Sequence, residues 1–107
     1  MERYGSRDTP ARIEALIQAA LTSEQGRRKI AAAQALLNEQ LHSGRLTAES
    51  VLVTFKRHVD ISVANQLSRT SEGQVGYHSY TCSGLAEKAA RRLADEFLAR
   101  ADRPRRP

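Results

Sequence analysis

The chain has 107 residues, with 17 basic and 12 acidic side chains and a formal net charge of +5. This length accommodates one domain with one hydrophobic core. No apolar run approaches the ~20 residues that a membrane span needs, and a single cysteine excludes an internal disulfide. We therefore expect a single-domain cytoplasmic protein that does not associate with membranes.

Residues 1–8 carry alternating charges and few apolar side chains, so we expect them to form a flexible arm. A helix is predicted to follow, because Thr9 is a suitable N-cap and Pro10 fits the first helical position. Apolar residues then recur at helical spacing as far as Leu21, which gives this helix one apolar face.

A second helix is predicted to begin immediately afterwards. The sequence from Thr22 to Gln25 matches a capping box, with Thr22 as the N-cap and Gln25 as its reciprocal partner. We expect Gly26 to weaken the first turn by about 1 kcal/mol relative to alanine, and Gly44 to end the helix in a left-handed conformation. One long helix bent near residue 23 is an alternative interpretation of the same pattern.

A third helix is predicted over residues 48–69, with Thr47 as its N-cap. Its apolar residues recur every four positions, which is typical of one buried helical face. Residues 59–63 also alternate between apolar and polar types, and β-branched side chains are mediocre helix formers. A short strand or a break near Asp60 is therefore an alternative.

Residues 70–83 contain several glycines together with Tyr77, Tyr80 and Cys82, and this composition predicts a loop. Cys82 would then lie just before the start of the next helix.

The last helix is predicted from residue 83 or 84 to about residue 101, where pairs of apolar residues recur every four positions. Residues 103–107 contain two prolines and are expected to form a basic tail. The sequence thus predicts an all-α fold: one helical domain of about four helices over residues 9–102.

The predicted core is thin, since the chain has two phenylalanines and no tryptophan. Alanine-rich helices bury little area each, so we expect the domain to complete its core in a homodimer or against another protein. The apolar faces of the third and last helices would be shared between core and partner, and exposed tyrosines are favoured interface anchors. The predicted partner-binding residues are Val51, Phe55, Val59, Val63, Tyr77, Tyr80, Leu93, Phe97 and Leu98.

The residues that could carry chemistry are scattered along the chain. His42, His58 and His78 lack the close spacing of a zinc site, and Cys82 with His78 lacks a third group that would orient a catalytic pair. We therefore expect no metal site, no cofactor and no catalytic residues. In a symmetric dimer, Cys82 could form an intermolecular disulfide.

Nucleic-acid binding is the alternative function. Residues 61–69 have the character of a recognition helix, in which Asn65, Gln66 and Arg69 would contact bases or phosphates. A basic cluster of Arg27, Arg28 and Lys29 would add phosphate contacts. The preceding segment lacks the permissive turn of a helix-turn-helix, which favours one continuous helix over this motif.

The beginning of the chain has an aromatic residue and a glycine, followed by Arg-Ile-x-x-Leu-Ile at the start of the first predicted helix. This pattern resembles the beginning of a group of small bacterial proteins, and the residues that carry it are Tyr4, Gly5, Arg12, Ile13, Leu16 and Ile17. In its size, its arginine- and alanine-rich composition and its helical pattern, the whole chain also resembles the small, helical quorum-sensing antiactivators of the QslA type in bacteria. The second resemblance implies a non-catalytic homodimer that binds and inhibits a LuxR-type transcription regulator.

Overall fold

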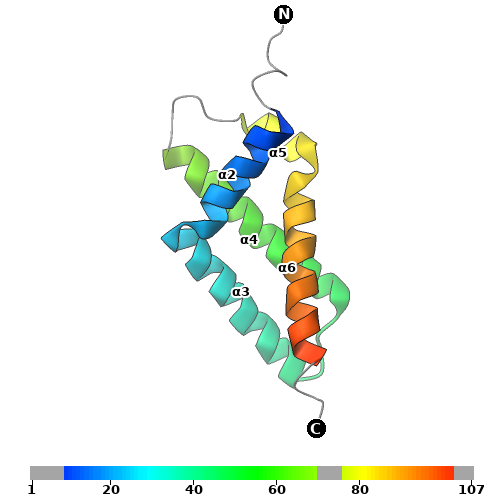
Figure 1. Cartoon of the computed structure of the whole chain (residues 1–107). Helices are drawn as coiled ribbons and strands as arrows, with labels where there is room; N and C mark the ends of the chain where they lie inside the picture. Colours follow the sequence, from blue (N-terminus) through cyan, green and yellow to red (C-terminus); the bar gives the residue numbers. More distant parts are fainter. Residues whose placement is uncertain (1–8, 70–75, 103–107) are drawn as a thin grey trace, which may run out of the picture.

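The computed structural model describes residues 9–69 and 76–102, and all regular structure in those ranges is helical (Figure 1). The predicted all-α fold is therefore confirmed, although the described ranges hold five helices rather than about four. The predicted arm and basic tail lie outside the described residues. The helices are α2 (Pro10–Thr22), α3 (Glu24–His42), α4 (Ala48–Arg69), α5 (Tyr77–Ser83) and α6 (Leu85–Asp102).

A single residue, Ser23, separates α2 from α3. Its backbone is extended, with φ −65° and ψ 160°, so these are two helices and not one bent helix. The Ser23 hydroxyl accepts a hydrogen bond from the Gly26 N–H at 2.9 Å and thereby caps α3. The prediction of Thr22 as the N-cap is wrong, because its hydroxyl donates to the Gln18 carbonyl oxygen within α2, at 2.8 Å.

Gly26 lies where α3 turns closely against the end of α2. A Cβ added there would lie 1.9 Å from the carbonyl oxygen of Ala20 and 3.1 Å from the Cα of Leu21. The expectation that alanine would suit this position better is therefore wrong. Steric overlap with backbone outweighs a difference in helix propensity of about 1 kcal/mol.

The other predicted caps are confirmed. Thr9 accepts a hydrogen bond from the Arg12 N–H at the start of α2, and Gly44 follows α3 with φ 78°. Before α4, the Thr47 hydroxyl accepts from the Ser50 N–H at 3.0 Å, while the Ser50 hydroxyl accepts from the Thr47 N–H at 3.2 Å. This reciprocal pair satisfies two of the backbone donors that a helix start leaves unpaired.

The helix α4 runs without interruption from Ala48 to Arg69, with neither a strand nor a break near Asp60. Packing of its buried face decides the conformation, since tertiary contacts outweigh the weak helix propensity of β-branched residues. Residues 61–69 are thus the second half of one continuous helix, not a separate recognition helix after a turn.

The prediction of a loop over residues 70–83 is wrong for its second half, where α5 forms. Gly76 precedes α5 with extended backbone, and Gly84 ends it in a left-handed conformation with φ 75°. Tyr80 holds this short helix on the domain, because its side chain is only 1% exposed. Residues 70–75 lie outside the described residues.

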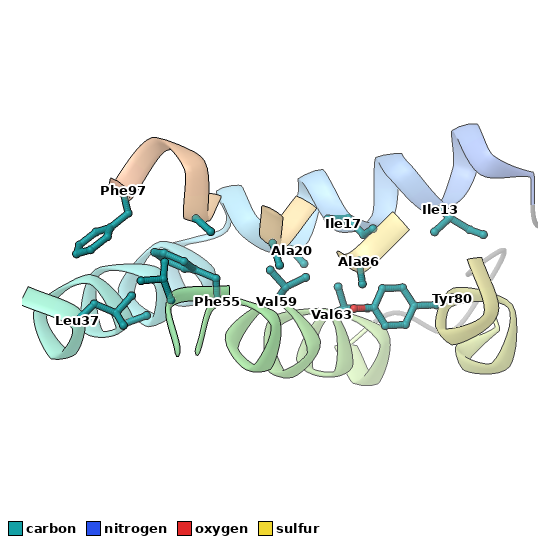
Figure 2. Packing of buried hydrophobic residues seen from close by; sticks show 14 residues of the cluster. Ile13, Ile17, Ala20, Leu37, Phe55, Val59, Val63, Tyr80, Ala86 and Phe97 are labelled. Atoms are coloured by element: carbon teal, nitrogen blue, oxygen red, sulfur yellow. The ribbon is translucent and has the colours of Figure 1, made fainter. Parts of the chain in front are cut away.

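The core is built around α4, which packs against α2, α3 and α6, and most extensively against α6 (Figure 1). Phe55 and Phe97 meet edge to face near one end of the core, with ring centroids 6.2 Å apart, and Val63 lies near Tyr80 towards the other end (Figure 2). Small side chains on α6 let it approach α4 closely. These are Ala86, Ala90 and Ala94.

Replacement of Gly26 by alanine is predicted to lower the free energy of unfolding by about 1–3 kcal/mol, the usual cost of overpacking. Urea denaturation followed by circular dichroism measures the change. Arg27→Ala, at the exposed neighbouring position, is the matched control and should change stability by less than about 0.5 kcal/mol. A Gly26→Ala variant as stable as the wild type would contradict the close approach.

Candidate interaction surfaces

The residues predicted to bind a partner do not form one surface. Six of them are 4% exposed or less and supply the core of the chain itself. Neighbouring helices already cover these side chains, so they have almost no area left for a partner. They are Val51, Phe55, Val59, Val63, Tyr80 and Phe97.

The other three predicted partner-binding residues differ from one another. Leu93 and Leu98 are half-buried and pack against the same core. Tyr77 begins α5, and its side chain lies outside the described residues.

The prediction of Tyr80 as an exposed anchor is wrong, because its hydroxyl is needed inside. It donates a hydrogen bond to Asp60 Oδ1 at 2.6 Å, and Lys56 Nζ lies 3.1 Å from Asp60 Oδ2. A buried tyrosine requires a partner for its hydroxyl. The carboxylate of Asp60 therefore joins α5 to α4 and is already engaged on both oxygens.

Cys82 is exposed and lies in the last turn of α5, rather than just before α6 as predicted. Its Sγ lies 3.6 Å from Nε2 and 3.9 Å from Nδ1 of His78, one helical turn earlier. The pair is open to solvent, and an intermolecular disulfide through Cys82 stays a prediction.

A groove of about 530 Å³ runs between α3 and α6, and we refer to it as the α3–α6 groove. Its apolar part is formed by Leu41, Phe97 and Ala101, and its other lining residues are polar. Arg100 is exposed and forms no ion pair within the described ranges. The polar lining residues are Gln34, Asn38, His42 and Arg100.

The face of α4 that points away from the core is partly apolar. Val53 is 50% exposed and Ile61 is 38% exposed, and both line a shallow depression of about 510 Å³ beside α6. We refer to Glu49, Val53, Arg57 and Ile61, which follow one another at intervals of four residues, as the α4 outer ridge. All four are exposed.

The sequence analysis did not predict this ridge, because the other face of the same helix has a stronger apolar repeat. The signal was present: Val53 and Ile61 lie two positions away from core residues, which places them on the opposite side of a helix. The α3–α6 groove had no comparable signal, since it depends on the angle between two helices.

The structure brings together the two segments singled out for nucleic-acid binding. Arg69 Nη2 at the end of α4 donates to Gln25 Oε1 in the first turn of α3 at 3.1 Å, and both border one small space with Asn65 and Gln66. Arg27 and Arg28 are exposed on the same first turns of α3, although Arg28 also pairs with Glu24 at 2.7 Å.

His58 lies where α4 faces α3. Its half-buried ring has a buried Nδ1 with no hydrogen-bond partner among the described residues. Burial lowers the pKa of His58 below its ordinary value of 6.5, and the positive charges of Lys29 and Arg57 lower it further. His58 is therefore neutral near pH 7, and its protonation opposes folding.

Within the described ranges, no three side chains of His, Cys, Asp or Glu type are grouped so that they could hold a metal ion. None of the helices described for this chain combines the length and apolarity needed to cross a bilayer. The chain matches no protein-family model, no curated protein and no solved structure.

Acidification is predicted to destabilise the protein through His58. Because the pKa of His58 is lower in the folded than in the unfolded chain, the unfolded state takes up the proton first as the pH falls below about 6.5. The contribution of neutral His58 to stability is complete above about pH 6.5 and is lost as the pH falls towards the folded-state pKa. Thermal denaturation between pH 7.5 and pH 5 measures this loss, which should be smaller in His58→Gln; an equal loss in both proteins would contradict the assignment.

Proposed function

We propose that this protein is a non-catalytic regulatory protein that binds and inhibits another protein, and that the partner is a LuxR-type transcription regulator. The α3–α6 groove is the observation that carries the proposal. It is lined by both apolar and polar side chains, a combination that protein interfaces also have. A groove between two helices is also suited to receive an amphipathic helix.

The polar residues that line the groove indicate which side chains that helix would carry. Arg100 has no ion-pair partner among the residues described, and His42 is held in place at 2.8 Å from the Asn38 carbonyl oxygen. A partner helix with apolar residues towards Leu41 and Ala101 and a carboxylate towards Arg100 would complement the groove. The resemblance to quorum-sensing antiactivators supports a transcription regulator as the source of this helix.

Filling the groove is predicted to abolish inhibition. Asn38→Trp places a large side chain in the groove without altering a buried residue, and should weaken binding at least about tenfold. The measurements are calorimetric titration against purified LuxR-type regulators from the same organism, and loss of the regulator's DNA binding as the inhibitor is added.

Ala35→Trp is the matched control, because Ala35 is exposed on α3 but does not line the groove. This variant should bind the regulator as the wild type does. Equal binding by both tryptophan variants would contradict the groove as the binding site, and no binding by the wild-type protein would contradict the regulator as the partner.

Nucleic-acid binding is a second candidate function, favoured by the contact between Arg69 and Gln25. This contact joins the end of α4 to the basic first turns of α3. Arginine side chains from two helices would then meet one stretch of phosphate backbone.

Removal of these charges is predicted to weaken binding to duplex DNA and to lower its salt dependence. Arg27→Gln and Arg69→Gln should each reduce the slope of log affinity against log salt by about 1. Fluorescence anisotropy across a salt series measures the slope, and Arg92→Gln on the exposed part of α6 is the control that should leave it unchanged. Absence of binding to both DNA and RNA at about 50 mM salt would contradict this candidate.

A further inference from the structure

We propose that the α4 outer ridge is a self-complementary interface that binds a second copy of this chain. The ridge shares no residue with the α3–α6 groove, so the two surfaces can be tested separately. The order of residues along the ridge defines the orientation and the charge pairs of the dimer.

The first observation is the order of residues along the ridge. Val53 has Glu49 four residues before it and Arg57 four residues after it, so the two charges lie at equal distances of about 6 Å on either side of Val53. Residues four apart form the ridges by which helices most often pack together. An acid and a base at equal distances from an apolar centre are self-complementary across a two-fold axis.

The second observation is the charge of Arg57. The neighbouring charges in the same depression are paired within the chain: Lys56 with Asp60 at 3.1 Å, and Glu87 with Arg91 at 3.0 Å. Neither Arg57 nor Glu49 forms an ion pair with any described residue. Arg57 is therefore available to pair with a carboxylate of another molecule.

A second copy supplies that carboxylate in one orientation. When two α4 helices pack in opposite directions about a two-fold axis at Val53, the two Val53 side chains meet, and Glu49 of each copy lies opposite Arg57 of the other. The contact forms two equivalent ion pairs around an apolar centre. Ile61 extends the apolar surface beyond Arg57, and at 38% exposure it has area left to bury.

The two-fold arrangement also explains why exposed valine and isoleucine are tolerated on α4. Their burial removes apolar surface from water, while the flanking charges fix the register and direction of the two helices. A parallel arrangement would place Arg57 against Arg57 and is disfavoured by repulsion. The self-complementary charges thus select one dimer.

The experiment is a charge exchange, with mass measured by sedimentation equilibrium under reducing conditions so that Cys82 cannot link two chains. The wild type should have twice its monomer mass of 11.9 kDa. Arg57→Glu and Glu49→Arg should each raise the dissociation constant at least about tenfold, because each opposes two like-charged pairs across the interface. The double variant, which exchanges the two charges, should have a dissociation constant within about threefold of the wild-type value.

The double variant separates an interface effect from damage to the helix. If Glu49→Arg acted only by weakening the first turn of α4, adding Arg57→Glu would not restore the dimer. Arg100→Glu, in the α3–α6 groove, is the control that should leave the mass unchanged while weakening regulator binding. A monomer at all concentrations up to about 200 µM, a dimer insensitive to either single reversal, or a double variant that is not restored would each overturn the proposal.

Discussion

The arrangement of the molecule depends on the packing of three helices against one face of α4. Because α2, α3 and α6 all bury their apolar residues against this face, the opposite face has no cover from the described part of the chain. The break at Ser23 and the close approach at Gly26 make this possible, since they turn α3 away from α2 while both helices keep contact with α4. The interaction surfaces are direct results of that one-sided packing.

Side-chain size varies along the core. The buried residues of α6 are alanines until Phe97, and those of α4 are mostly valines apart from Phe55. The larger side chains gather at one end, where Phe55 meets Phe97 and Leu37 lies nearby (Figure 2). Phe97 also lines the α3–α6 groove, so the core extends to the surface of that groove.

Much of the fold could be predicted because its determinants are local. Apolar spacing and caps such as Thr9 and Thr47 depend on residues a few positions apart, and both caps are confirmed. The predictions for Gly26 and Tyr80 were wrong because contacts between helices decide these positions. The backbone of Ala20 in α2 leaves no room for a side chain at position 26 of α3. Asp60 in α4 accepts a hydrogen bond from the Tyr80 hydroxyl and so holds this side chain inside.

The surfaces were harder to predict than the core for the same reason. An apolar repeat identifies which residues will be buried, but it does not distinguish burial within the chain from burial against a partner. The core face of α4 has an unbroken four-residue repeat of apolar residues, whereas the outer ridge has charges between its apolar residues. Faces that meet both water and a partner combine apolar and polar residues in this way. Because the outer ridge lies on α4 and the α3–α6 groove is lined by α3 and α6 alone, a contact between two outer ridges would leave the groove of each copy accessible to a further protein.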